Sequence, residues 1–116
     1  LRKDSFSKIS PLQRIQPINL KMIQKWPVIL GRVQANHGTT LLLEAPNVSR
    51  YHASISKDAS GNYILQDNST NGTIINQLRI EDSIQLQDRD VITIGPYQLK
   101  FQNSSLSIYS SLEDAW

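Results

Sequence analysis

The chain has 116 residues, a length that suits a single domain with a hydrophobic core of its own. Its 39% hydrophobic and 19% charged residues are typical of a globular protein, and its lack of cysteine excludes a disulfide framework and a thiol nucleophile. The net charge of +2 comes from basic residues scattered along the chain, a distribution that argues against a nucleic-acid partner.

Short apolar runs recur about every ten residues, and glycine, proline, asparagine and aspartate separate them. The runs occupy residues 19–23, 28–30, 39–43, 52–56, 63–66, 72–75, 83–86, 91–94 and 98–101. No window of eleven residues shows the apolar stripe of a helix. Many short strands at this spacing indicate an all-β sandwich or barrel.

The two ends of the chain depart from this pattern. Residues 1–13 contain three serines and Pro11, and we predict that they form a tail or an edge strand. We expect the β domain at residues 14–103 and a C-terminal linker at the serine-rich residues 104–116. Because the chain begins with Leu1 rather than methionine, we expect it to be one piece of a longer protein.

The first polar cluster closes the apolar run 28–30 with Gly31 and Arg32. The glycine permits a tight bend, and the arginine is then expected at the mouth of a loop. A guanidinium offers a planar fork of donors that suits phosphate oxygens, although a plain surface arginine is the more common meaning of such a pair.

The second cluster, at residues 49–52, leads into a predicted strand. The Ser49 hydroxyl and neighbouring amides can turn toward an anion, and Arg50 adds charge beside them; alternatively, Ser49 is an ordinary turn residue. We expect His52 to be a half-buried imidazole that ties two loops together. The chain has only one other histidine, His37, and no carboxylate at a familiar ligand spacing, so we expect no metal.

The third cluster, at residues 69–73, contains the strong turn signal Asn71–Gly72. A plain hairpin would explain that signal alone. Thr70 stands directly before Asn71, and a hydroxyl beside a carboxamide can bind a phosphate oxygen and clamp a peptide backbone.

The sequence resembles a forkhead-associated (FHA) domain in the order and spacing of four motifs: Gly31–Arg32 and residues 49–52, 69–73 and 88–95. The resemblance covers residues 17–102, which is most of the chain. It implies an antiparallel β-sandwich of two twisted sheets with about eleven strands, whose loops at one end bind phosphothreonine peptides.

The resemblance also implies roles for individual residues. Those expected to bind the phosphopeptide are Arg32, Ser49, Arg50, Thr70 and Asn71. Those expected to hold the loops in shape are Gly31, His52 and Gly72. Those expected where family members select the residue three places after the phosphothreonine are Asn47, Gly95 and Tyr97. One departure is the pair Asn76–Gln77, where the family usually has Asn-Gly, and we therefore expect a different turn type there.

These implications describe a phosphorylation-dependent protein–protein interaction module in signalling, without cofactor or enzymatic activity. We expect it to be intracellular, in the cytoplasm, as one domain of a larger protein such as an ABC-type ATPase or a kinase-network effector. A hydrolase would use Ser49, His52 and Asp67, but Ser49 lacks the Gly-x-Ser-x-Gly elbow. A phospho-independent interaction or self-association module of the same fold remains the alternative.

Overall fold

The computed structural model describes residues 17–111 of the chain. It contains eleven strands and the short 3-10 helix η2, Leu20–Met22. The strands are β1 (Ile18–Asn19), β2 (Val28–Gly31), β3 (Thr39–Leu42), β4 (Ala53–Lys57), β5 (Tyr63–Asp67), β6 (Ile74–Ile75), β7 (Leu78–Arg79), β8 (Ser83–Gln85), β9 (Val91–Ile94), β10 (Tyr97–Gln102) and β11 (Ser105–Ser111). None of the helices in residues 17–111 is long and apolar enough to cross a membrane.

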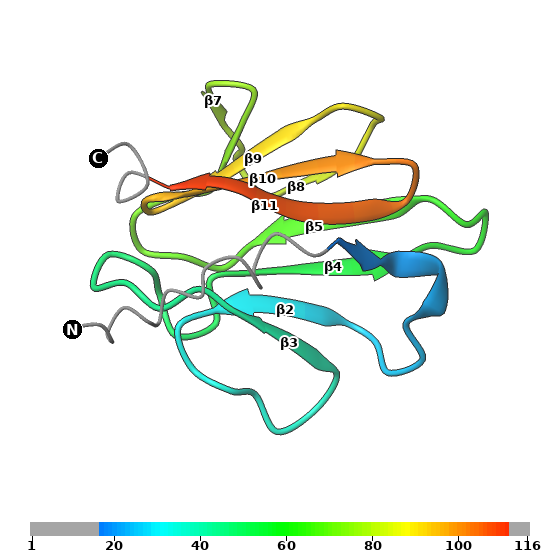
Figure 1. Cartoon of the computed structure of the whole chain (residues 1–116), viewed down its shortest axis with the longest axis horizontal. Coiled ribbons are helices and arrows are strands. Elements are labelled where there is room, and N and C mark those ends of the chain that lie inside the picture. The colour runs from blue at the N-terminus through cyan, green and yellow to red at the C-terminus, as the bar shows by residue number, and fades with distance from the viewer. Residues whose placement is uncertain (1–16, 112–116) are drawn as a thin grey trace, which may run out of the picture.

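The strands form two sheets that pack face to face, as Figure 1 shows. The six-stranded sheet has the order β1-β11-β10-β9-β6-β7, and the five-stranded sheet has the order β3-β2-β4-β5-β8. The prediction of an all-β sandwich with about eleven strands is therefore confirmed. One pair departs from the antiparallel pattern, because β2 and β3 are parallel, with Val28 opposite Thr39.

The core lies between the two sheets and follows from the period of two in the strands. In β10, for example, Tyr97, Leu99 and Phe101 are buried and alternate with more exposed residues. Fully buried aliphatic side chains come from both sheets and from their connections: Leu20, Val28, Leu30, Leu43, Val48, Ala53, Ile55, Leu65, Ile92, Ile94, Leu99 and Leu106. Each large one stabilises the fold by about 1.5–3 kcal/mol.

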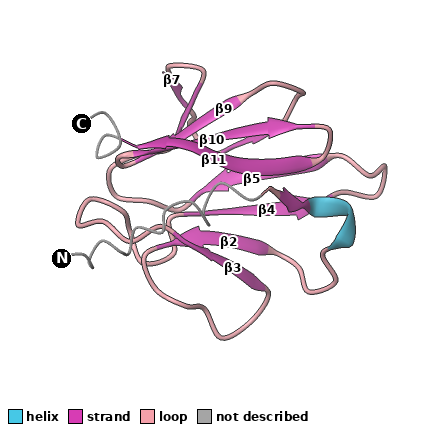
Figure 2. Ribbon diagram, viewed as in Figure 1, coloured by secondary structure: helices cyan, strands magenta, loops and turns pink. Residues whose placement is uncertain are grey.

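Two segments differ from the sequence predictions. Residues 105–111 form β11 instead of part of a linker, because Leu106 and Ile108 are buried and alternate with serines that mask their period in the composition. Residues 20–22 form η2 instead of continuing a strand, and Figure 2 shows this helix next to β1. The Asn19 side chain caps it by accepting a hydrogen bond of 3.0 Å from the Lys21 amide. The predicted N-terminal tail, residues 1–13, and residues 112–116 lie outside the described residues.

The hairpin of β6 and β7 turns at Asn76 and Gln77, whose φ angles are +50° and +75°. Positive φ at both central residues is the geometry that Asn-Gly adopts in a type I′ turn, so the expectation of a different turn type is wrong. The hairpin returns the chain to the start of β6, where the Ile80 amide donates to the Thr73 carbonyl at 3.0 Å.

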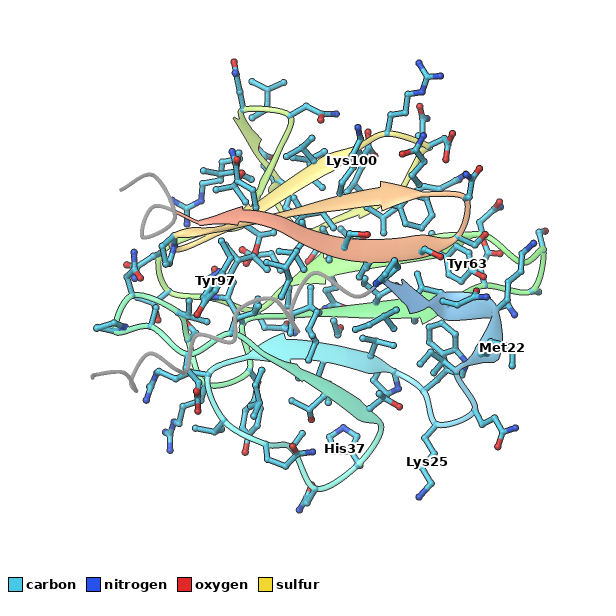
Figure 3. The ribbon with its side chains drawn as sticks, viewed as in Figure 1. Met22, Lys25, His37, Tyr63, Tyr97 and Lys100 are labelled. Carbon is cyan, nitrogen blue, oxygen red and sulfur yellow. The ribbon has the colours of Figure 1, made fainter. Side chains whose placement is uncertain are left out.

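Strand register brings several loops to one end of the sandwich. Leu30 near the end of β2 and Asp67 at the end of β5 both pair with Ala53 at the start of β4. The turn from β9 to β10 lies at this end too, which is on the left of Figure 1. In Figure 3, Tyr97 marks this loop end and Tyr63 the opposite end.

Candidate functional site

The loop of residues 44–52 packs directly against the end of β2. A β-carbon built on Gly31 would lie 2.1 Å from the Arg50 carbonyl oxygen, so any side chain there would push this loop away. The Arg32 amide donates to the Ser49 carbonyl at 3.1 Å. The absence of a side chain at residue 31 therefore lets β2 place Arg32 beside Ser49.

The Arg32 side chain is exposed and held at one point. Its Nε donates to the Val48 carbonyl at 2.9 Å. No other hydrogen bond or ion pair of this guanidinium occurs within residues 17–111, so both Nη groups keep their donors. A guanidinium fixed through Nε and open at both Nη atoms can bind an anion with two parallel hydrogen bonds.

Ser49 connects this loop to the loop of residues 68–73. Its Oγ accepts a hydrogen bond of 3.1 Å from the Thr70 amide, across 21 residues of sequence. Because the hydroxyl acts as acceptor in that contact, its hydrogen is left to donate to another oxygen. Arg32, Ser49 and Thr70, which the sequence placed in three separate motifs, are thus joined directly or through one neighbour.

Asn71 makes a second contact between these loops. Its Nδ2 donates to the Asn47 carbonyl at 3.1 Å, which leaves Oδ1 as a free acceptor within residues 17–111. Thr70 is exposed, and its hydroxyl has no hydrogen-bond partner within the same residues. An acceptor and a hydroxyl are therefore available side by side on the rim of the loop.

His52 lies beneath both loops and is fully buried, rather than half-buried as expected. Its Nδ1 accepts a hydrogen bond of 2.9 Å from the Ser49 amide, and Nε2 lies 2.8 Å from the Gly72 carbonyl oxygen. Since Nδ1 accepts, the network assigns the proton of a neutral ring to Nε2, which donates to Gly72. The imidazole therefore links the two loops, as predicted.

Asp67 organises the loop of residues 68–73 from within. Its Oδ1 accepts hydrogen bonds from the Ser69 amide at 3.1 Å, the Ser69 hydroxyl at 2.6 Å and the Thr73 hydroxyl at 2.8 Å. The Ser69 hydroxyl in turn accepts from the Gly72 amide at 2.7 Å. Burial raises the pKa of Asp67, but the hydrogen bonds from Ser69 and Thr73 outweigh it, and the pKa lies below its ordinary value.

These contacts leave no Ser-His-Asp relay. Both ring nitrogens of His52 are occupied by backbone groups, and Asp67 bonds to Ser69 and Thr73 rather than to the imidazole. Within residues 17–111, no group of three histidine, cysteine, aspartate or glutamate side chains could hold a metal ion.

The residues predicted to select a neighbouring position divide into two kinds. Asn47 and Gly95 lie together at the loop end, since a β-carbon built on Gly95 would lie 2.9 Å from Asn47 Oδ1. Tyr97 is 7% exposed, and its hydroxyl donates to the Glu44 carbonyl at 3.0 Å. It therefore supports the start of the 44–52 loop from below, and it presents little surface to a ligand.

Two further arginines lie at this end. Arg50 is exposed and forms no ion pair within residues 17–111. Arg79, on β7, was not predicted as a site residue. A β-carbon built on Gly72, whose φ is +103°, would lie 2.7 Å from Arg79 Nε and 3.0 Å from its Cζ. The Arg79 guanidinium thus lies against the glycine of the 68–73 loop.

Two proteins of known name are similar to this chain over part of their length. The transcriptional regulatory protein EmbR of Mycobacterium tuberculosis is 36% identical over 75 residues, 64% of this chain and 19% of EmbR. The ABC transporter ATP-binding/permease protein Rv1747 of the same organism is 34% identical over 80 residues, 69% of this chain and 9% of the transporter. The chain thus spans less than a fifth of either relative.

Solved structures are similar as well. The FHA-2 domain of the M. tuberculosis transporter Rv1747 has 33% identity and a TM-score of 0.59, covering 72% of this chain and 74% of that domain. The FhaA FHA domain complexed with the intracellular domain of Rv3910 has 33% identity and a TM-score of 0.53, covering 75% and 82%. The model of the FHA domain family matches residues 28–95, more than half of the sequence. The chain belongs to the FHA domain family.

Proposed function

We propose that this chain binds phosphothreonine peptides at its loop end and so mediates phosphorylation-dependent protein–protein interactions in signalling. One observation carries the proposal. Hydrogen bonds connect Arg32 to Ser49 and Ser49 to Thr70, and the side chains of these residues keep donors that have no acceptor within residues 17–111. Recognition of phosphorylated motifs through arginines and hydroxyls is the mode to which FHA domains belong.

Each proposed contact uses a donor or acceptor that has no partner within residues 17–111. The two Nη groups of Arg32 and the Ser49 hydroxyl bind phosphate oxygens, and Arg50 adds charge nearby. The Thr70 hydroxyl adds a further donor. Asn71 Oδ1 accepts a main-chain amide of the peptide, while its Nδ2 stays on the Asn47 carbonyl.

The energy of these contacts makes binding depend on the phosphate. A phosphorylated threonine carries a charge of about −1.5 to −2 and three acceptor oxygens. Hydrogen bonds to charged groups contribute about 1.5–3 kcal/mol each, so losing two of them weakens binding about a hundredfold or more. Asn47 and Gly95 lie next to this site and are proposed to contact a residue that follows the phosphothreonine.

Two structures of relatives support a peptide or protein ligand. One shows M. tuberculosis EmbR in complex with a low-affinity phosphopeptide, at 29% identity and a TM-score of 0.52. In the other, the FhaA FHA domain holds the intracellular domain of Rv3910. We propose no catalytic role for the present chain, because the only buried imidazole within residues 17–111 has both nitrogens bound to backbone groups.

We further propose that the chain is the FHA part of a longer protein, such as an ABC-type ATPase or a kinase-network effector. Its similarity to a small part of the Rv1747 transporter supports this context. A cytoplasmic position follows from the proposed ligand, since protein kinases and their ATP are found there. The domain then extends through β11, which pairs with both β1 and β10.

The test is isothermal titration calorimetry with three versions of each peptide from an oriented library: phosphothreonine, phosphoserine and unphosphorylated threonine. We expect binding to the phosphothreonine version and a loss of about a hundredfold without phosphate. The phosphoserine version lacks one methyl group, worth about 0.8 kcal/mol, and should bind about fourfold more weakly. Equal affinity for phosphorylated and unphosphorylated peptides would instead indicate the phospho-independent module.

A further inference from the structure

Three guanidinium groups surround the loop end, and none forms an ion pair within residues 17–111: those of Arg32, Arg50 and Arg79. The contacts proposed for a single phosphate use Arg32 and the charge of Arg50. Arg79 is left over, although it lies against the same loop. A guanidinium without an ion pair, next to a loop that is proposed to bind the peptide, can bind a further anion.

The β6–β7 hairpin determines the position of Arg79. Arg79 pairs with Ile74, the first residue of β6, and the adjacent Ile80 amide donates to the Thr73 carbonyl. This register places the guanidinium against Gly72, next to the asparagine that we propose grips the peptide main chain. Ser49, by contrast, contacts Thr70, so Ser49 and Arg79 contact different residues of the 68–73 loop.

The nearby carboxylates do not neutralise Arg79. Asp67 is engaged by Ser69 and Thr73, which hold its carboxylate inside the loop. Glu81 and Asp82 follow Arg79 in sequence and are exposed, and neither forms an ion pair with it. The guanidinium therefore remains open to a ligand while the chain is unbound.

We infer that the preferred peptide carries a second anionic group close to its phosphothreonine, either a carboxylate or a second phosphate, and that Arg79 binds it. This inference rests on the proposed function, because it adds one contact to the same ligand. Arginine suits the role, since its planar fork fits both carboxylate and phosphate oxygens. Because Arg79 is exposed, the preference is modest: about threefold for a carboxylate and about tenfold for the more highly charged phosphate.

The experiment is a position scan with the 116-residue chain. A phosphothreonine peptide of alanines receives aspartate, glutamate or phosphoserine at each of the four positions on either side, and affinities are measured by fluorescence anisotropy. Wild type, Arg79→Gln and Arg79→Lys are compared with the control Arg89→Gln. Arg89 is also an exposed arginine, but its amide donates to the Phe101 carbonyl, far from the loop end.

We expect at least one position where an anionic residue strengthens binding to wild type. Arg79→Gln should abolish that gain, Arg79→Lys should retain most of it, and both should bind the all-alanine phosphothreonine peptide as wild type does. A flat scan for wild type overturns the inference and leaves the proposed function intact. So does an equal loss for every peptide, or a loss that Arg89→Gln reproduces. Failure of every phosphothreonine peptide to bind wild type would reject the proposed function itself.

Discussion

Replacing His52 with alanine removes the buried link between the two loops that carry the proposed site. The imidazole is 0% exposed, accepts from the Ser49 amide and donates to the Gly72 carbonyl. Alanine leaves both backbone groups without this partner and opens a cavity of about the size of the ring. We expect His52→Ala to lower the free energy of unfolding.

The size of the effect follows from these contacts. Two hydrogen bonds contribute about 1 kcal/mol each, and the cavity adds about 1 kcal/mol or more, so the free energy of unfolding should fall by about 3 kcal/mol. For a domain of this size, that corresponds to a decrease in Tm of roughly 12–24 °C. The direct contacts of Ser49 with Thr70 and of Asn71 with Asn47 remain, so folded His52→Ala should still bind phosphopeptide.

The assay combines urea unfolding, followed by circular dichroism, with calorimetry well below the Tm of the variant. His37→Ala is a matched control, because His37 is exposed, forms its only hydrogen bond within residues 17–111 with the Asn36 side chain and lies on the loop after β2 (Figure 3). It should change the free energy of unfolding by less than about 0.5 kcal/mol. The reasoning fails if the two variants are equally stable, or if His52→Ala is fully folded and no longer binds peptide.

Three other predictions concern the site and its surroundings. Arg32→Ala and Ser49→Ala should each weaken phosphothreonine-peptide binding at least about tenfold in calorimetry while moving the Tm by only a few degrees, since each side chain makes a single hydrogen bond within residues 17–111 and offers its remaining donors to the proposed ligand. Unchanged affinity would contradict their roles. Gln77→Gly should raise the free energy of unfolding by about 1 kcal/mol, because residue 77 has φ +75° and glycine relieves that strain; a loss of stability in urea titrations would refute it. Asp67 has a lowered pKa in the folded chain, so its ionisation stabilises the fold above about pH 4, and this contribution is lost as the pH falls through the folded pKa. The decline in Tm below that pH should be shallower in Asp67→Asn than in wild type. Equal slopes of Tm against pH for the two proteins would show that other titrating groups cause the decline.

Local patterns were enough to predict the sandwich and most of its strands. Where they failed, long-range packing decided the outcome. Leu106 and Ile108 alternate with Ser105 and Ser107, so the segment resembles a linker in composition, and it is pairing with β10 and β1 that makes it a strand. Residues 20–22 become a helical turn because Asn19 caps them, a contact that competes with extension of β1.

The same distinction holds for the site. Its residues were predicted from three short motifs, and the register of β2, β4 and β5 brings those motifs together. Asp67 and Arg79 were missed as contributors to the loop. The hydrogen bonds of Asp67 depend on how residues 69–73 fold back on it, and the position of Arg79 depends on a two-residue strand that carries almost no sequence signal.

The hydrogen bond from Tyr97 to Glu44 joins a strand of one sheet to the loop that carries Asn47 and Ser49 beside the other. The proposed ligand surface is therefore held by a contact between the two sheets as well as by the contacts within one of them. An unfolded chain has no such surface, so a bound peptide stabilises the folded state. A peptide present at a hundred times its Kd should therefore add about 2.7 kcal/mol of resistance to unfolding.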